Sequence, residues 1–518
     1  MPEAGGPPTG VTDEADAQAA ETEIHHGNQF IKILRHGSWY FAASVLTKLA
    51  ALVLVPIYTN YLTPTEYGIL GTLDAVSRLL PLFISLYLDA SFIRFYYVER
   101  RIGAERVRTL YSTQFWFVAV WGSGICVLGL LLAPIAIQPL VDTPFLPYMP
   151  LVFAAPLFTQ LGIMGSQVMR ADLHAREVSV INLGSFVAMA SVSLTLLIGF
   201  GYGVESLLWG LAAGPFLSFL VFTTIAIRRR LLTWTFDWAT LRRSLMFSLP
   251  LMPNLAGGWI NGFSNRLILA NYGTLAEVGL FTISAQLGYV MYFLTDSVTQ
   301  VQDPIGMSAL TADPEAGKRQ IAEFLSVFAW SILAAFLAVT LFSKEVVSLL
   351  TAPAYHSAYV LVGVFAFAYV CGAMYRVFTL VLTYHRRLRV IGAGAALSAA
   401  VNVALMFALV PSYGQTAAAW SFLGSTLLYA LWIVWWAQRT DRIPLDWRIL
   451  TPSLVGAAAV IVAYLVLDHL SPGELVEVPV KAGLLGAYVA MIFVVPGMSP
   501  LRAGVTNQLR VVRDRLRA

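Results

Sequence analysis

The sequence predicts an all-α integral membrane protein of about fourteen transmembrane helices, arranged as two pseudo-symmetric six-helix bundles followed by a C-terminal helix pair. Two observations lead to this fold class. Apolar residues make up 58% of the 518-residue chain and charged residues only 12%, whereas a soluble domain carries roughly 25% charged residues. The second observation is an internal repeat at a constant offset, which is typical of transporters built from repeated halves.

The apolar residues cluster into runs that are long enough for a helix to cross a hydrocarbon core roughly 30 Å thick. The first copy of the repeat contains six runs, at 37–60, 68–92, 110–133, 146–169, 177–200 and 203–227. The second copy contains six more, at 244–270, 277–301, 320–342, 356–384, 389–411 and 414–437. Two further runs follow, at 450–468 and 479–497.

The repeat is clearest in two nonapeptides that lie 211 residues apart. Residues 60–68 read NYLTPTEYG and residues 271–279 read NYGTLAEVG, with five identities. The same offset relates further identical pairs: His174 and His385, Arg176 and Arg387, Trp209 and Trp420. In both nonapeptides a threonine followed three residues later by a glutamate matches an N-terminal capping box. We therefore expect these segments to start helices rather than to bind a substrate.

The organisation of the chain follows from these runs. We expect a disordered acidic cytoplasmic tail at 1–30, because it holds few large apolar residues. An N-terminal six-helix bundle at 31–230, a C-terminal six-helix bundle at 231–440 and the extra helix pair at 441–498 follow. Residues 499–518 carry an apolar stripe at helical spacing that is opposed by arginines, as in a basic amphipathic helix that lies on the cytoplasmic leaflet; a solvent-exposed basic tail is the alternative.

The cations predict the orientation. With a cytoplasmic N-terminus, 27 of the 33 Lys and Arg residues fall on the cytoplasmic side, whereas only Lys344 and Lys481 fall on the other. This imbalance follows the positive-inside rule and places both termini in the cytoplasm of a bacterial cell, with the protein spanning the cytoplasmic (inner) membrane many times.

Several function classes are disfavoured. Cys126 and Cys371 both fall inside expected helices, so they predict neither a structural disulfide nor a metal site. The sequence holds no nucleotide-binding glycine-rich loop, no nucleophile elbow and no cleavable signal peptide. We expect a protein that is not an enzyme, has no cofactor and binds no nucleic acid.

Four cations lie within the expected helices, where an ionisable residue costs roughly 2.5–3.5 kcal/mol and usually faces a cavity or a partner. Lys48 has no acid within one turn, which favours a ligand as its partner. Arg78 follows Asp74 by four residues, so the two charges could simply neutralise each other. Arg266 lies near the outer end of its helix and could snorkel. Arg376 lies on the helix at 356–384, outside the expected cavity, and we interpret it as structural.

Polar residues recur at helical spacing on the same helices, which indicates an aqueous central cavity. The helix at 68–92 carries Asp74, Arg78, Pro81, Ser85 and Asp89 on one face. The helix at 244–270 carries Asn254, Gly258, Asn261 and Asn265, and the helix at 277–301 carries Tyr292, Asp296, Thr299 and Gln300, with Asp303 beyond its end.

The segment 56–68, PIYTNYLTPTEYG, at the end of the first helix resembles the polysaccharide-exporter family of Wzx-type O-antigen flippases, within the multidrug/oligosaccharidyl-lipid/polysaccharide (MOP) superfamily. Residues 347–355, VSLLTAPAY, resemble the outer turn of the same family. The resemblance covers about 30–500. It implies a V-shaped pair of bundles around a cavity lined chiefly by the helices at 37–60, 68–92, 244–270 and 277–301. It also implies a polyprenyl-pyrophosphate-linked oligosaccharide cargo, moved from the inner to the outer leaflet, with a polysaccharide polymerase and chain-length machinery as protein partners.

Roles for the cavity residues follow as hypotheses. Lys48, Arg78 and Arg266 would hold the pyrophosphate, because a diphosphate needs cationic hydrogen-bond donors. Sugar-facing positions would be Tyr40, Asn254, Trp259, Asn261, Asn265 and Tyr289. Asp74, Asp89 and Asp296 could couple transport to H⁺ or Na⁺, although charge balance for nearby cations is an equal alternative.

Three alternatives remain open. A cation-coupled drug or metabolite antiporter of the same superfamily would prefer an acidic cavity, which the buried cations argue against. A flippase for a lipid II-type peptidoglycan precursor would need the same diphosphate site. A membrane glycosyltransferase or polymerase would need a large outer loop or soluble domain, whereas the outward loops are short.

Overall fold

A computed structural model describes residues 46–470, 474–495, 498 and 502. Within these ranges all regular elements are helices, which confirms the all-α fold class. The expectations for the tail at 1–30, for Tyr40 and, apart from Arg502, for 499–518 fall outside the described residues.

The N-terminal half begins with a helical segment at 46–61. Its remaining elements are α2 (Pro64–Ser85), α3 (Leu88–Ile102), α4 (Ala104–Ala136), α5 (Gln138–Val141), α6 (Tyr148–Ala171), α7 (Ala175–Leu194) and α8 (Val204–Arg228). A π-helical turn at Thr195–Gly199 extends α7.

The C-terminal half begins with three short helices, α9 (Trp238–Ser248), α10 (Met252–Gly262) and α11 (Ser264–Tyr272). Its remaining elements are α12 (Leu275–Ala312), α13 (Pro314–Leu341), α14 (Ser343–Leu350), α15 (Tyr359–Tyr384), α16 (Leu388–Thr440), α17 (Trp447–Leu470) and α18 (Glu474–Val494). A 3₁₀ turn at Pro353–Ala358 leads into α15.

Eleven helical stretches in the described chain are long and apolar enough to cross a membrane. One of them, Leu388–Thr440, is interrupted by the non-helical Gly414 (φ 53°, ψ −135°), which separates the expected runs at 389–411 and 414–437. The segments at 46–61 and 238–272 are not among the eleven. The protein is therefore a multi-pass membrane protein, and the count of fourteen stays a prediction.

Two helices that we expected to be continuous are broken. The expected helix at 68–92 ends at Ser85, because Leu86 and Tyr87 adopt left-handed φ angles of 48° and 60° before α3 begins. The expectation of a single polar face from Asp74 to Asp89 is therefore wrong. The expected helix at 244–270 is also divided, by a 3₁₀ turn at Leu249–Leu251 that contains a proline and by a distorted backbone at Phe263.

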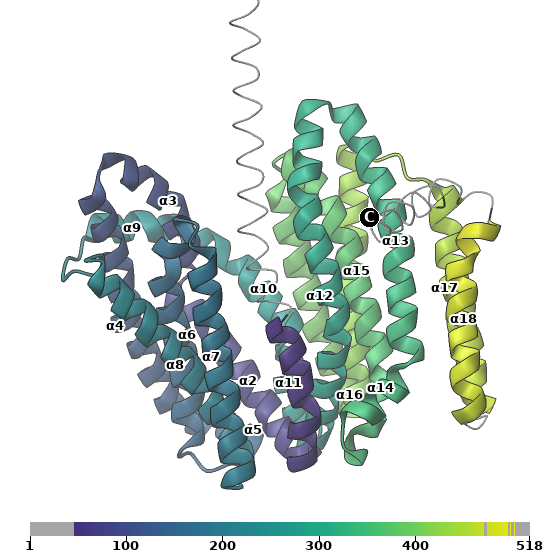
Figure 1. The fold of residues 1–518 in the computed structure, drawn as a ribbon, viewed down its shortest axis with the longest axis horizontal. Coiled ribbons are helices and arrows are strands. Elements are labelled where there is room, and N and C mark those ends of the chain that lie inside the picture. The colour runs from purple at the N-terminus through teal and green to yellow at the C-terminus, as the bar shows by residue number, and fades with distance from the viewer. Residues whose placement is uncertain (1–45, 471–473, 496–497, 499–501, 503–518) are drawn as a thin grey trace, which may run out of the picture.

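The two halves form two bundles that diverge towards one end of the molecule and meet at the other (Figure 1). We call the end where they diverge, near α3, α9 and the turn between α12 and α13, the cation-rich end, because the arginines at the ends of α3, α8 and α15 lie there. We call the opposite end, where α2 and α12 begin, the closed end. The helices α17 and α18 pack on the outside of α13.

The repeated nonapeptides hold the closed end together. Thr63 and Glu66 form a capping box that starts α2, and Thr274 and Glu277 form its counterpart at the start of α12, which confirms the expected caps. The glycine that ends each nonapeptide lies at a backbone contact between these helices. A Cβ atom added to Gly68 would lie 1.7 Å from the carbonyl oxygen of Leu275. A Cβ atom added to Gly279 would lie 2.0 Å from that of Pro64, so only glycine permits this approach.

Ion pairs hold the C-terminal helix pair, α17 and α18, against the second bundle. Lys481 of α18 is fully buried, and its ammonium lies 2.7 Å from both Glu345 of α14 and Glu477 of α18. Lys344 also contacts Glu477, at 3.1 Å. The two cations that we expected on the outer side therefore share one ionic cluster, which fixes α18 against α14 because a buried ion is tolerated only when it is paired.

Candidate functional site

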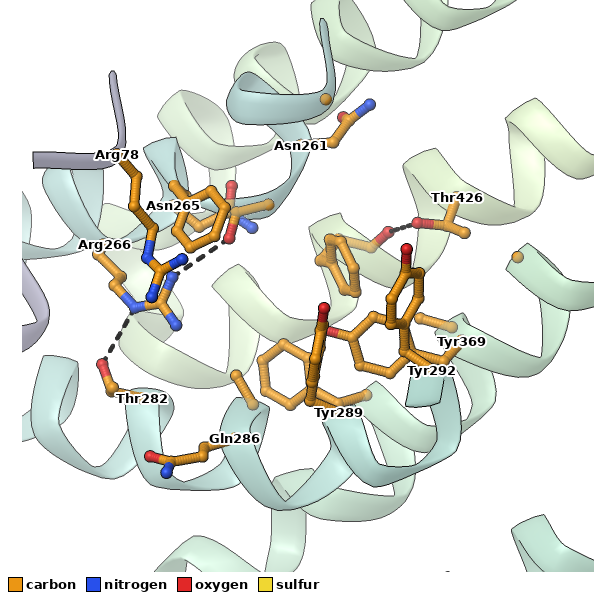
Figure 2. Close-up of a pocket in the computed structure, with 18 of the residues that line it drawn as sticks. Arg78, Asn261, Asn265, Arg266, Thr282, Gln286, Tyr289, Tyr292, Tyr369 and Thr426 are labelled. Atoms are coloured by element: carbon orange, nitrogen blue, oxygen red, sulfur yellow. Dashed lines mark hydrogen bonds between the residues drawn. The ribbon is translucent and has the colours of Figure 1, made fainter. Parts of the chain in front are cut away.

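A cavity with a volume of about 1010 Å³ lies between the bundles. Its walls come from the segment 46–61, α2, α7 and α8 of the first half and from α10, α11, α12, α15 and α16 of the second. The expectation that four helices would chiefly line it is therefore too narrow, because α15 and α16 also contribute many residues. Figure 2 shows basic and amide side chains at one end of the cavity and a tyrosine cluster at the other.

Arg78 and Arg266 meet at the basic end. The guanidinium carbon of Arg78 lies 5.0 Å from the ring centroid of Phe263, and that of Arg266 lies 5.4 Å from the same centroid. The break between α10 and α11 places Phe263 in this position. The structure thus brings two of the three proposed pyrophosphate ligands to one aromatic ring, an arrangement that cation–π attraction favours.

The two arginines differ in how they are held. The Nε atom of Arg78 donates to Asp74 one helical turn away, at 2.7 Å, and the Arg78 side chain remains half exposed. Arg266 is buried, its Nε donates to the hydroxyl of Thr282 at 3.2 Å, and its Nη1 donates to the carbonyl of Gly262 at 3.2 Å. These bonds fix the orientation of the Arg266 guanidinium (Figure 2).

Two asparagines of the expected helix at 244–270 line the cavity beside the arginines. Asn265 is buried and accepts a hydrogen bond from Asn402 at 2.8 Å, which joins α11 to α16. Asn261 donates weakly to Ser398 at 3.4 Å, and its buried Oδ1 has no hydrogen-bond partner within the described structure. Because an unpaired buried oxygen costs free energy, Asn261 is the more suitable of the two for contact with a ligand.

Tyrosines form the other end of the cavity. The rings of Tyr289 and Tyr292 stack at a centroid distance of 4.8 Å, and Tyr369 contacts both rings edge to face. Tyr375 and Tyr429 form a second pair at 4.6 Å. The sequence predicted Tyr289 as a cavity residue but not Tyr369 of α15 or Tyr429 of α16.

Arg376 also lines the cavity. The expectation that its helix lies outside the cavity is wrong, because α15 packs along α12 on the cavity side. Arg376 forms an ion pair with Asp296 and lies 3.8 Å from Asp303. Its spacing from Tyr369, Gly372 and Thr379 is that of one helix face, and this polar stripe is the signal that could have revealed it.

The remaining candidates lie elsewhere. Lys48 lies outside the cavity lining, with its ammonium 3.8 Å from the ring centroid of Phe293. Trp259 donates its indole N–H to the carbonyl of Ala75 at 3.0 Å, so it joins α10 to α2 instead of facing the cavity. Asp89 lies on α3 beyond the break. Asn254 belongs to α10, but its side chain is outside the described structure.

The fold of the chain is similar to that of solved membrane transporters. A structure of the lipid II flippase MurJ in an inward closed conformation is similar over 89% of this chain and 99% of that chain, with a TM-score of 0.68 at 11% identity. An inward-facing multidrug-resistance MATE transporter of the MOP superfamily is similar over 77% of this chain and 98% of that one, with a TM-score of 0.58 at 13% identity. No curated protein sequence matches the chain.

The chain is thus a multi-pass membrane protein with the fold that MurJ and MATE transporters share. Arginines and tyrosines are among the residues that line its cavity. The family follows from the sequence. Residues 59–360 match the profile of the family described as "Polysaccharide biosynthesis protein". The chain belongs to this polysaccharide biosynthesis family.

Proposed function

We propose that this protein moves a polyprenyl-pyrophosphate-linked oligosaccharide from the inner to the outer leaflet of the bacterial cytoplasmic membrane, for the synthesis of a surface polysaccharide such as O-antigen. The observation that supports this most is the charge of the cavity. Its described lining holds three arginines, Arg78, Arg266 and Arg376, and one acid, Asp74. Asp74 pairs with Arg78, and Asp296 and Asp303 pair with Arg376, whereas no described carboxylate forms an ion pair with Arg266. A buried cation without a carboxylate partner favours an anionic cargo.

The arginine pair suits a diphosphate. Each guanidinium offers donors in a planar fork that matches two phosphate oxygens. Arg266 is held in place by Thr282 and Gly262, so little conformational entropy is lost when it binds. Phe263 lies beside both arginines, and the burial of Arg266 strengthens the interaction of its guanidinium with a negative group. We assign Lys48 a lesser role, because it lies beside Phe293.

The tyrosine end suits the glycan. Sugar rings present apolar C–H faces that pack on aromatic rings and hydroxyls that need hydrogen-bond partners. Tyr289, Tyr292 and Tyr369 supply the faces, and the unpaired Oδ1 of Asn261 supplies an acceptor. A cargo with its diphosphate at Arg78 and Arg266 would then extend its sugars towards α15.

A cationic drug is a poorer fit, because it would meet the buried guanidinium of Arg266, which no described carboxylate neutralises. A lipid II-type precursor would satisfy the same arginine pair, and the family match favours a polysaccharide precursor instead. The two cargoes differ in their glycan, so the tyrosine end is where selection between them would occur.

We propose that transport is coupled to H⁺ through Asp74 and Asp296, two of the acids that the sequence suggested for this role. Asp74 pairs with Arg78 and Asp296 pairs with Arg376. Protonation of either carboxylate would release its arginine for a phosphate, which links ion binding to cargo binding. Na⁺ bound at the same carboxylates is the alternative ion.

The test neutralises the arginines. Arg78→Gln and Arg266→Gln should each lower transport of a polyprenyl-diphosphate oligosaccharide about 10–100-fold, because each removes charge-assisted hydrogen bonds worth roughly 1.5–3 kcal/mol. Transport is measured as the appearance of the glycan on the opposite face of proteoliposomes that contain equal amounts of folded protein. Arg101→Gln, at the exposed end of α3, is the matched control and should transport normally.

Arg266→Lys separates charge from geometry, since it keeps the charge without the planar fork. We expect intermediate transport from this variant. Wild-type rates in the Arg78→Gln/Arg266→Gln double variant would refute the proposed site.

A further inference from the structure

A second depression lies at the cation-rich end of the N-terminal bundle. It has a volume of about 640 Å³ and is formed by α6, α7 and α8. Three arginines line it, Arg176, Arg228 and Arg229, together with one acid, Glu177. Apolar side chains that include Val221 and Ile225 form the rest of its wall. It shares no lining residue with the central cavity.

The arginines lie where a membrane would end. Arg176 is the second residue of α7 and Arg228 is the last residue of α8, and both helices are candidate membrane spans. Val221 precedes Arg228 by two helical turns, or about 10 Å along the axis at 1.5 Å per residue. The depression therefore has a basic mouth at the headgroup level and an apolar wall at the depth of the acyl chains.

The internal repeat supplies a natural comparison. The offset of 211 residues carries Arg176 onto Arg387 and Arg228 onto Arg439, so two of the three basic positions repeat, whereas Arg229 falls on Thr440. It carries Val221 onto Trp432 and Ile225 onto Trp436, so the apolar wall does not.

Tryptophan occupies the corresponding space in the second half. The indole of Trp432 donates to the carbonyl of Val390 at 3.0 Å. The same ring lies against Gly394, where an added Cβ atom would come within 2.4 Å of it. At the corresponding positions of the first half, the smaller Val221 and Ile225 line the depression.

We propose that this depression binds an anionic phospholipid, with the headgroup phosphate at Arg176, Arg228 and Arg229 and an acyl chain along Val221 and Ile225. Three guanidiniums against one carboxylate leave an excess of positive charge, and guanidinium pairs well with phosphate oxygens. Basic pockets between membrane helices at the cytoplasmic face are recognised by anionic headgroups in this way. The proposal does not depend on the cargo of the central cavity.

The test measures lipid occupancy by native mass spectrometry of the full-length protein, taken from nanodiscs of phosphatidylglycerol or phosphatidylcholine. We expect bound phosphatidylglycerol on the wild-type protein and little phosphatidylcholine. The Arg176→Gln/Arg228→Gln/Arg229→Gln variant should bind phosphatidylglycerol on the order of a hundredfold more weakly, since each cation contributes roughly 1 kcal/mol near an anionic surface.

Two further variants make the result specific. Val221→Trp/Ile225→Trp introduces the two tryptophans that the second half has at the corresponding positions. It fills the depression without changing its charge and should abolish lipid binding. Arg386→Gln/Arg387→Gln/Arg439→Gln removes three charges from the corresponding region of the second half and should bind like the wild type.

Three results would overturn the proposal. One is equal occupancy by phosphatidylglycerol and phosphatidylcholine on the wild-type protein. Another is retention of the lipid by the tryptophan variant, which would indicate attraction to surface charge alone. The third is displacement of the lipid by inorganic phosphate at equal concentration, which would indicate a general anion site.

Discussion

The three arginines of the central cavity differ in what stabilises them. A carboxylate on the same helix neutralises Arg78, and two carboxylates of α12 neutralise Arg376. Arg266 is stabilised by the hydroxyl of Thr282, the carbonyl of Gly262 and the faces of Phe263 and Phe281. A guanidinium held by dipoles and rings keeps its full charge available for an anion. Arg266 is therefore the residue on which anion binding should depend most.

Arg376 should matter for stability. Arg376→Gln leaves Asp296 and Asp303 without their cation, and we expect the free energy of unfolding to fall by about 1–3 kcal/mol. The range lies below that for a fully buried pair, because the Arg376 side chain is 35% exposed. Thermal unfolding in detergent measures the change. Arg376→Lys keeps the charge and should retain most of the stability, and an unchanged melting temperature for Arg376→Gln would show that the ion pair contributes nothing.

At the scale of the elements, the starts of α2 and α12 determine how closely the two halves approach. Capping boxes fix the first turn of each helix. The glycines that follow let the two backbones touch, since no Cβ atom separates them. The broken helices affect the direction of side chains. Their distorted backbones at Leu86, Tyr87 and Phe263 allow side chains to point in directions that a regular helix would not permit.

Gly68→Ala should separate α2 from α12. The added methyl group would overlap the Leu275 carbonyl, and overpacking of this kind costs about 1–3 kcal/mol. We expect a lower melting temperature. We also expect a cysteine introduced at the closed end to react faster with a thiol reagent than it does without the substitution.

Gly124→Ala is the matched control for this substitution, because no atom lies within 4 Å of the added methyl group. It should be neutral or slightly stabilising, since alanine is the better helix former. Equal melting temperatures for the two variants would contradict the close contact at Gly68.

At the scale of the molecule, the halves are joined at the closed end by contacts between distant parts of the chain. The backbone N–H of Ala352 donates to the hydroxyl of Thr59 at 3.2 Å. The hydroxyl of the fully buried Tyr355 donates to the carbonyl of Leu62 at 2.9 Å. A cargo that leaves through this end requires these contacts to break, whereas the bundles diverge at the other end (Figure 1).

A disulfide across the closed end should stop transport. Cysteines introduced at Thr59 and Ala352 are close enough to be cross-linked, and the native Cys126 and Cys371 are buried and should not compete. We expect transport to cease on oxidation and to return on reduction, measured in the same proteoliposomes. Each single-cysteine variant serves as the control, and transport at the wild-type rate by fully cross-linked protein would show that the closed end need not open.

The sequence alone was sufficient for the membrane class, the repeat, the capping boxes and most of the apolar segments, because these depend on local composition and spacing. It also identified Arg78, Arg266, Asn261 and Tyr289, since a polar group in an apolar helix is conspicuous wherever that helix packs. It did not predict the breaks in the helices at 68–92 and 244–270, since they depend on backbone geometry that apolar length does not reveal.

Only the tertiary structure decided which polar groups share a space. Lys48 and Trp259 are residue types that suit a cavity lining. Packing instead places Lys48 against Phe293 and Trp259 against the backbone of α2. Arg376 was assigned to the wrong surroundings, because the position of α15 beside α12 is set by contacts between helices far apart in the chain. Sequence spacing determines which face of a helix is polar, whereas the neighbour of that face depends on how the whole bundle packs.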